Sequence, residues 1–201
     1  VHILSRSKTQ YPNKDVNSFQ WNLSKEQIDP ACIKGVDAII HLAGEGIANQ
    51  RWTRRRKKKL LESRTKSIKL IYSLLEKDVT HRVKTVISAS GTGYYGNRPN
   101  EILTEESPPS NTFLAQLCVA WEHAAQEGSK FHIRTINMRT GFVLSNQGGA
   151  LAPMAKLTKL GLGSTLGDGA QWVSWIHMED VVQMYIFALE HPNIHGIYNM
   201  V

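Results

Sequence analysis

One short segment gathers hydroxyl and phenol side chains that could do proton-transfer chemistry. Residues 88–96 read Ser-Ala-Ser-Gly-Thr-Gly-Tyr-Tyr-Gly. The hydroxyls of Ser90 and Thr92 can orient a substrate oxygen, and the phenol of Tyr94 or Tyr95 can exchange a proton with it. A phenol has a pKa of about 10, so it accepts a proton at neutral pH only beside a cation. We therefore predict Ser90, Thr92 and Tyr94 as catalytic residues.

Two residues farther along the chain could give this chemistry polar support. They are Arg139, at the end of a β-branched run, and His177, just before an amphipathic stretch. Glu179 and Asp180 open that stretch, and acidic residues at a helix start stabilise the free N–H groups there. We expect Asp180 to be structural.

An arginine directly after the first apolar run bears on cofactor choice. Residues 1–4 are apolar and β-prone, apart from His2, and Ser5 and Arg6 follow them. At the end of the corresponding strand of a dinucleotide-binding unit, an acidic residue binds the ribose hydroxyls of NAD, whereas an arginine suits the 2′-phosphate of NADP. Ser5 and Arg6 therefore predict NADP, and the alternative is an ordinary surface arginine.

Short β-branched runs alternate with amphipathic stretches of helical length, which is typical of βαβ units around a parallel sheet. The expected strands are 1–5, 19–23, 36–42, 84–90, 132–139 and 196–201. The expected helices are 53–77, with Thr53 as its cap, 112–127, 150–160 and 179–190. The near-continuous apolar run 36–44 indicates a strand buried on both faces. The fold class is thus α/β.

Ligands of open parallel sheets bind outside the carboxyl ends of the strands. Leu42, Ala43 and Gly44 follow one expected strand, and Ser88 lies at the end of the next. Small residues there let a flat ligand approach the backbone closely. We therefore predict that these four residues line a cofactor site.

Composition and charge exclude several classes of protein. The net charge of +7 comes from one run, because residues 51–59 hold seven cations and the remaining 17 Lys and Arg balance 17 Asp and Glu. We interpret the run as the solvated start of a helix and predict no nucleic-acid partner. No apolar stretch approaches the roughly 20 residues that cross a bilayer, so we predict a cytoplasmic protein without a membrane partner.

The cysteines and histidines do not indicate a metal site. Cys32 and Cys118 have no Cys or His at ligand spacing, and we expect both to be buried thiols. His191 and His195 lie four apart in a stretch broken by Pro192. We predict no metal, a small-molecule substrate as the partner, and leave a homodimer open.

Tryptophans follow the glycine-rich stretch 159–169. This stretch lacks the Lys-Ser/Thr ending of a phosphate-binding loop. With Gln171, Trp172 and Trp175 behind it, it could form a lid or platform for a flat or sugar-like ligand. Core packing of both tryptophans is the alternative.

Eight short motifs, in order over nearly the whole chain, resemble the atypical branch of the extended short-chain dehydrogenases within the NAD-dependent epimerase/dehydratase superfamily. Members of this branch are described as epimerase family proteins or as nucleoside-diphosphate-sugar epimerase-like. The motifs are His41-Leu42-Ala43-Gly44-Glu45, Arg51-Trp52, Ser63-Arg64, Gly93-Tyr94-Tyr95-Gly96, Thr104-Glu105-Glu106, Trp121-Glu122, Arg139-Thr140-Gly141 and Trp175-Ile176-His177-Met178-Glu179-Asp180.

The resemblance implies a Rossmann-like, doubly wound parallel sheet with helices on both faces. It implies one NADP-binding domain over residues 1–201, with 144–201 contributing the substrate side. A first βα unit with its glycine-rich turn and a C-terminal substrate segment are expected to lie outside these residues, since no Gly-x-x-Gly-x-x-Gly follows a strand.

The resemblance also implies roles for individual residues. Leu42 and Ala43 would lie along the adenosine and ribose, Arg64 and Lys59 would reach the cofactor, and Val143 would sit near the nicotinamide amide. Tyr95, in contrast, also has a plain packing role in the wider family.

The usual catalytic pair of the superfamily is missing. Its members use a Tyr-x-x-x-Lys pair, and no tyrosine here is followed by lysine at that spacing. Aligned on Trp121-Glu122, the two positions hold approximately Leu114 and Cys118. The leading hypothesis is an NADP-dependent oxidoreductase or epimerase acting on a small substrate, with sugar nucleotides as one class. The alternative is a cofactor-binding sensor or scaffold with little turnover.

Overall fold

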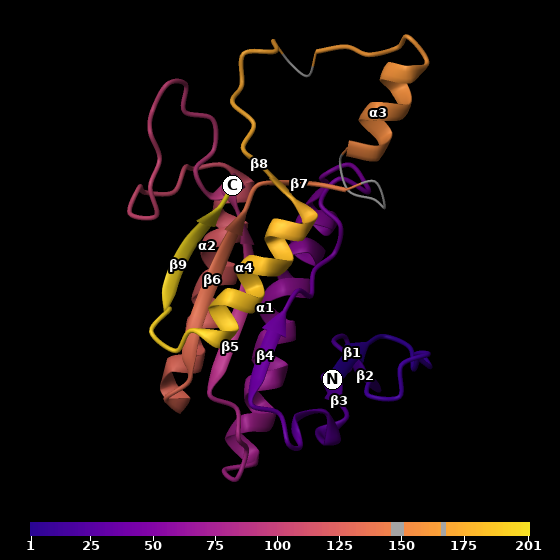
Figure 1. The fold of residues 1–201 in the computed structure, drawn as a ribbon, viewed down its shortest axis with the longest axis vertical. Helices are drawn as coiled ribbons and strands as arrows, with labels where there is room; N and C mark the ends of the chain where they lie inside the picture. The colour runs from indigo at the N-terminus through magenta and orange to yellow at the C-terminus, as the bar shows by residue number, and fades with distance from the viewer. Residues whose placement is uncertain (146–150, 166–167) are drawn as a thin grey trace. The chain divides into compact units, whose positions relative to one another are not determined.

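The computed structural model describes residues 1–145, 151–165 and 168–201 (Figure 1). Contacts divide the chain into two compact units: unit 1 comprises residues 1–88 and 120–135, and unit 2 comprises residues 89–119 and 136–201. Each unit combines two separate stretches of chain. The polypeptide passes between them in three elements, namely β5 (Thr85–Gly91), α2 (Phe113–Gln126) and β6 (Arg134–Thr140).

Unit 1 begins with a small sheet. Strand β1 (His2–Ser5) pairs in parallel with β2 (Asn17–Asn22), and β2 pairs antiparallel with β3 (Gln27–Ile28). A 3-10 turn over Pro30–Ile33 follows. Because β1 ends at Ser5, Arg6 lies directly beyond the carboxyl end of this strand.

The parallel sheet continues unit 1. Strand β4 (Ala38–His41) pairs in parallel with β5, with His41 opposite Ser88. At the start of β6, the N–H of Arg134 donates to the carbonyl of Lys84 at 2.9 Å. The strand order is β4-β5-β6-β9.

Helix α1 (Arg54–Lys77) supplies one wall of the core of unit 1. Apolar side chains recur along the helix at helical spacing, so Ile68, Ile71 and Leu75 all lie on its buried face. They pack with Val86 of β5, which is fully enclosed. The long helix is therefore fixed by burial of one face, and its charged side chains other than Arg56 and Arg64 are at least partly exposed.

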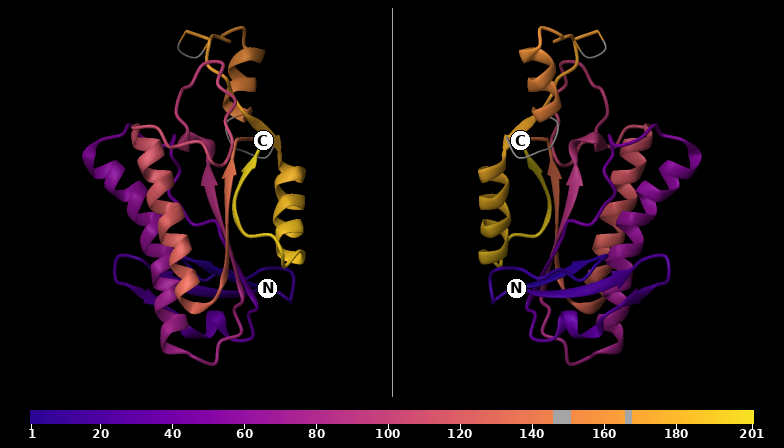
Figure 2. Two further views of the ribbon diagram at one scale, coloured as in Figure 1. Left: turned by 90° about the vertical axis from the view of Figure 1, so that its left-hand side faces the viewer. Right: turned by 90° about the vertical axis from the view of Figure 1, so that its right-hand side faces the viewer.

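Unit 2 contains the carboxyl ends of β5 and β6. Strand β9 (Gly196–Met200) pairs in parallel with β6, and β7 (Phe142–Leu144) pairs in parallel with β8 (Trp175–His177). Helix α4 (Met178–Glu190) and the part of α2 within this unit lie on opposite faces of β6 and β9 (Figure 2). The other elements of the unit are the 3-10 turn Thr92–Tyr94 and α3 (Leu151–Lys159).

The predicted long elements occur within two residues of their expected bounds. The expected start of one helix at Ala150 lies outside the described residues, as do residues 146–149 of the expected substrate side and Leu166 and Gly167 of the glycine-rich stretch. An α/β fold with a parallel sheet is confirmed. Strands β3, β7 and β8 were not predicted.

One expectation about β4 was wrong. The strand was expected to be buried on both faces, yet Ile40 is 46% exposed. Side chains of a strand alternate between its two faces. Ile39 packs against the core of unit 1, whereas Ile40 points to the opposite face and lacks such cover. An apolar run therefore indicates a strand, but not how many of its faces are covered.

Candidate cofactor site and catalytic cluster

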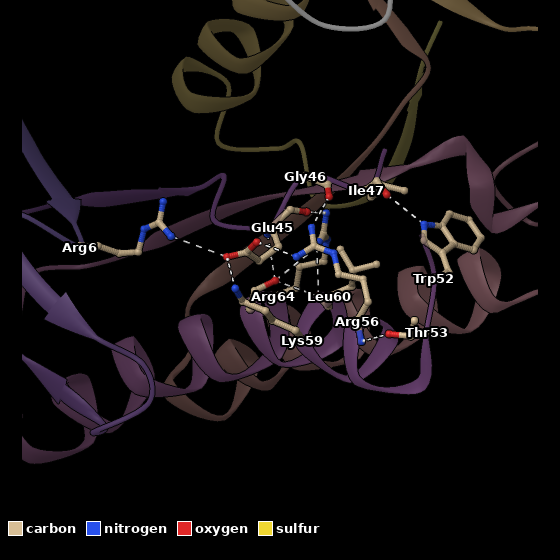
Figure 3. Close-up of polar contacts among 11 residues, drawn as sticks. Arg6, Glu45, Gly46, Ile47, Trp52, Thr53, Arg56, Lys59, Leu60 and Arg64 are labelled. Carbon is tan, nitrogen blue, oxygen red and sulfur yellow. Dashed lines mark hydrogen bonds and ion pairs between the residues drawn. The ribbon is translucent and has the colours of Figure 1, made fainter. Parts of the chain in front are cut away.

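Four cations contact Glu45, the single acidic residue of the loop after β4 (Figure 3). Oε2 of Glu45 lies 2.9 Å from Nη1 of Arg56. Its Oε1 lies 3.4 Å from Nζ of Lys59 and 3.7 Å from Nη1 of Arg6. The fourth cation, Arg64, donates to the backbone carbonyl of Glu45 at 3.1 Å. We call these five residues the Glu45 cluster.

Helix α1 aims two of these cations at the loop. Arg56, Leu60 and Arg64 recur at intervals of four residues, so they share one face of the helix. All three are buried, and Arg56 is only 6% exposed. Arg56 also donates to the carbonyl of Gly46 at 2.6 Å. The loop after β4 is therefore clamped to the helix by two guanidinium groups.

Gly44 lets the loop approach this closely. A Cβ atom added to Gly44 would lie 2.9 Å from Cζ of Arg64, closer than side chains tolerate. A larger residue at this position would require the end of the Arg64 side chain to move.

The electrostatics of the Glu45 cluster favour an added anion. A hydrogen bond from Arg56, reinforced by Lys59, lowers the pKa of Glu45, so this carboxylate is ionised at neutral pH. One negative charge then faces four positive ones. The side chains of Arg6 and Lys59 are 89% and 61% exposed, so both can reach an anion from solvent.

A buried histidine precedes the loop. His41 is 2% exposed, with Nε2 lying 2.7 Å from Oγ of Ser67 and Nδ1 lying 3.2 Å from Oγ of Ser88. Ser67 donates its own proton to the carbonyl of Arg64 at 2.7 Å, so Nε2 of His41 must donate to Ser67. Trp121 Nε1 donates to His41 Nδ1 at 3.4 Å. His41 is therefore held as the neutral Nε2–H tautomer.

Burial agrees with that assignment. Desolvation, followed by the charge of Arg64, lowers the pKa of His41 to about 4. A neutral ring at this place ties β4 to α1 and α2, and so fixes the strand that leads into the loop.

The other predicted cofactor residues of unit 1 differ in exposure. Leu42 is 64% exposed, Ala43 packs against the core, and Ser5 ends β1. Ser88 is fully buried, and its hydroxyl lies beside His41.

In unit 2, a second cluster surrounds the predicted catalytic tyrosine. The guanidinium of Arg139 lies 3.4 Å from the ring centroid of Tyr94 and donates to the hydroxyl of Tyr95 at 2.8 Å. Tyr95 in turn donates to Oδ1 of Asn199 at 2.7 Å. Arg139 is 1% exposed and Tyr95 4%, whereas Tyr94 is half-buried. Tyr95 is therefore a buried, hydrogen-bonded residue, and Tyr94 is partly exposed.

A shallow cavity of about 200 Å³ lies beside this cluster. Its wall includes Thr92 and Ser174, whose hydroxyls are 3.3 Å apart, and Trp172. The other lining residues are Tyr95, Gly96, Asn97, Arg98, Glu101, Leu103, Asn199 and Val201. Among the predicted catalytic residues, Thr92 thus lines the cavity, Tyr94 lies in the same 3-10 turn, and Ser90 is buried in β5.

The tryptophans behind the glycine-rich stretch are not core residues. Trp172 is 78% exposed and Trp175 is 59% exposed, so the core-packing alternative was wrong. The strand β8 that holds Trp175 has a single paired neighbour, β7, within the described residues, which leaves its other edge unpaired. His177 caps α4, accepting at Nδ1 from the N–H of Glu179 at 3.3 Å. Val143, in β7, pairs opposite Ile176.

Apolar and thiol side chains occupy the positions expected for the missing pair. Leu114 lies against Gly93, where an added Cβ would approach the Leu114 side chain to 3.3 Å. The thiol of Cys118 contacts the carbonyl of Gly91 at 3.5 Å. Neither side chain can deliver the cation-assisted proton transfer of a Tyr-x-x-x-Lys pair.

Comparison with known proteins decides the family. The model of the NAD dependent epimerase/dehydratase family matches residues 1–200. This chain belongs to that family. The resemblance inferred from the eight motifs is therefore confirmed.

Relatives within the epimerase family proteins are similar over nearly the whole chain. Epimerase family protein MT2273 of Mycobacterium tuberculosis is 38% identical over 90% of this chain and 60% of its own length. YfhF of Bacillus subtilis is 36% identical over 100% of this chain and 65% of its own. The chain thus spans about 60–65% of the length of these relatives.

Solved structures of the family share the fold. Human epimerase family protein SDR39U1, crystallised with NADPH, has a TM-score of 0.79 and 28% identity over 98% of this chain and 64% of its own. A nucleoside-diphosphate sugar epimerase from Corynebacterium glutamicum has a TM-score of 0.77 and 33% identity over 92% of this chain and 40% of its own.

In this member of the epimerase family, sequence reasoning missed three parts of the site. Glu45 was quoted as part of a motif but given no role, and Arg56 was interpreted as a solvated residue of the basic run. His41 was likewise unassigned. The spacing of Arg56, Leu60 and Arg64 was the available signal, because a cation four residues from a buried leucine shares its face.

The described residues of this family member contain no group of three or more His, Cys, Asp or Glu side chains that could hold a metal ion. Both cysteines are buried as expected, and burial raises the pKa of Cys32 to about 11. No described helix is long and apolar enough to cross a membrane.

Proposed function

We propose that this epimerase family protein binds NADP(H) at the Glu45 cluster and is an oxidoreductase or epimerase acting on a small substrate. The observation that carries the proposal is the pair of exposed cations, Arg6 and Lys59, beside the carboxyl end of β1. A phosphate on the nucleotide ribose finds there a planar guanidinium and an ammonium group. The NADPH bound by human SDR39U1, a structural relative at 28% identity, supports the same choice.

The residues of the chain would divide the work between cofactor and substrate. Arg6 and Lys59 would bind the ribose phosphate. The adenosine side would be shaped by Leu42, Ala43, Gly44 and Arg64. The remaining cofactor contacts would come from Ser5, Ser88 and Val143. NADP would supply or accept the hydride. Sugar nucleotides are one substrate class to test, because the C. glutamicum relative is named a nucleoside-diphosphate sugar epimerase.

On the substrate side, Tyr94 would exchange the proton while Thr92 and Ser90 orient the reacting oxygen. Tyr94 lies under the buried Arg139 cation at 3.4 Å, which fixes its ring and keeps positive charge beside it. This arrangement supplies a cation without a lysine four residues away.

A test of the cofactor uses Arg6→Ala in the full-length protein. Loss of a charged contact to the phosphate should weaken NADP binding by roughly tenfold to a hundredfold, equivalent to about 1.5–3 kcal/mol, and leave NAD binding nearly unchanged. Nicotinamide fluorescence titrations of both cofactors measure this. Equal losses for NADP and NAD would contradict the proposed role of Arg6.

Leu114 and Cys118 support a second candidate, a cofactor-binding sensor or scaffold with little turnover. The two candidates differ in NADPH oxidation across a panel of carbonyl compounds and sugar nucleotides. Substrate-dependent oxidation supports the enzyme, whereas tight NADP binding without turnover on the whole panel supports the sensor.

A further inference from the structure

The two carboxylate oxygens of Glu45 have different environments (Figure 3). Oε2 contacts the buried Arg56 at 2.9 Å, a normal charge-assisted hydrogen bond. Oε1 faces Lys59 and Arg6 at 3.4 and 3.7 Å, longer than the same kind of bond requires. One oxygen is therefore anchored, and the other makes loose ion pairs with exposed side chains.

We propose that Glu45 is a specificity-determining residue whose Oε1 takes the place of a ribose phosphate on Arg6 and Lys59 until the nucleotide binds. The inference rests on the proposed NADP binding and adds a competitor inside the site. When the phosphate arrives, Oε1 gives up Arg6 and Lys59, while Oε2 stays on Arg56. No covalent step is involved.

Charge explains why the exchange favours the phosphate. A phosphate monoester carries about −1.5 to −2 charges at neutral pH and three acceptor oxygens, whereas Oε1 belongs to a single shared carboxylate charge. Ion pairs of exposed side chains contribute little, so their exchange costs little. Breaking the buried contact with Arg56 would instead strand a charge away from water.

The cluster also has hydrogen-bonding capacity that Glu45 does not fill. Nε of Arg56 is buried and has no hydrogen-bond partner among the described residues. Buried donors are rarely left without one. Because this donor is closed to solvent and Oε2 stays on Arg56, it takes no part in the exchange at Oε1.

The presence of the Glu45 charge then has a measurable consequence. The retained carboxylate repels an incoming phosphate and lowers its affinity, while a ligand without this phosphate is unaffected. Glu45 thereby sets how strongly the site prefers a phosphorylated ribose.

The test replaces Glu45 by glutamine, which keeps the shape and an acceptor for Arg56 but removes the charge. The full-length protein is titrated calorimetrically with adenosine 2′,5′-bisphosphate and with adenosine 5′-monophosphate, which differ in the 2′-phosphate alone. We expect Glu45→Gln to bind the bisphosphate about threefold to tenfold more tightly and the monophosphate within about twofold of the wild type.

Two further variants keep the result interpretable. Glu62→Gln is the matched control, because Glu62 pairs with Lys66 elsewhere on the surface of α1 and should change neither affinity. In an Arg6→Ala, Lys59→Met background, Glu45→Gln should no longer tighten binding. If Glu45→Gln fails to fold, Lys59→Met alone decides, because it leaves the Glu45–Arg56 pair intact and should weaken the bisphosphate selectively.

The outcomes separate the two proposals. If the wild type binds both probes equally, NADP selectivity at this site is wrong and the role of Glu45 falls with it. If the wild type prefers the bisphosphate but Glu45→Gln binds it no better, or more weakly, the role of Glu45 alone is overturned. A Lys59→Met variant that binds each probe as tightly as the wild type does would also overturn it.

Discussion

The buried ring of His41 makes the stability of the folded protein depend on pH. The unfolded chain protonates this histidine near pH 6.5, whereas burial and the charge of Arg64 lower its pKa in the folded protein to about 4. Below pH 6.5 the unfolded state therefore binds a proton at His41, whereas the folded state does not bind one there until the pH approaches 4. The stability that the neutral ring provides is complete above pH 6.5 and is lost as the pH falls towards 4.

The expected loss can be measured by urea unfolding at pH 7 and pH 5. Between these values the wild type should lose about 2 kcal/mol of unfolding free energy through His41. His41→Gln should be less stable at pH 7, because it disturbs the bonds to Ser67 and Ser88, but should lack this part of the decline. An identical decline in both proteins would show that other groups cause it.

Single residues also show how far sequence reasoning reaches at this scale. Arg6 was assigned because its place after β1 follows from the strand pattern. Arg56 was not, because Arg54, Arg55 and Arg56 are chemically alike and only the rotation of α1 against the loop buries one of them. The ion-pair partner of a charged residue depends on the tertiary structure and cannot be predicted from residue type alone.

Among the elements, α1 has unfavourable electrostatics at its N-terminus. Its first turn holds Arg54, Arg55 and Arg56 and no acidic residue, although the N-terminus of a helix already carries partial positive charge. Thr53 offsets part of this cost, since its hydroxyl accepts from the N–H of Arg56 at 3.2 Å. The cap predicted from the sequence is confirmed.

Removal of this cap should therefore be costly. Thr53→Ala is expected to lower the unfolding free energy by about 0.5–2 kcal/mol, as for other helix caps. Thr65→Ala within the same helix is the matched control, because its hydroxyl bonds the carbonyl of Leu61 and caps nothing. Urea denaturation compares the two, and equal effects would argue against a special role for the cap.

Elements differ in how well their sequences define them. The helices α1, α2 and α4 were predicted closely because their apolar spacing repeats over several turns. Strands β7 and β8 have three residues each and owe their existence to pairing across 30 intervening residues, 145–174. Such a short run has no period to detect.

At the scale of the whole chain, the two compact units share three elements. The division between the units falls inside β5, α2 and β6, so each of these elements has residues in both units. The single domain expected over residues 1–201 stays a prediction. The sequence pattern indicates which segments form strands and helices, but not how contacts divide among them.

Calorimetry can test whether the units unfold together. We expect one transition with a ratio of calorimetric to van't Hoff enthalpy near one. Leu60→Ala in unit 1 should cost about 2–5 kcal/mol and Ile136→Val in unit 2 about 0.5–1.5 kcal/mol, since both side chains are fully buried. Each should move that transition as a whole. Two separable peaks, one sensitive to each substitution, would contradict the expectation.

The concentration of positive charge at the start of α1 also affects the speed of encounter. Arg54, Arg55 and Lys58 are exposed on the same helix end as Lys59 of the Glu45 cluster. Their field extends about 8 Å at physiological ionic strength, so it acts on an anionic nucleotide before any contact forms. Added salt should then slow capture of the nucleotide more than it hastens release, and this region would work as a funnel for diffusing anions.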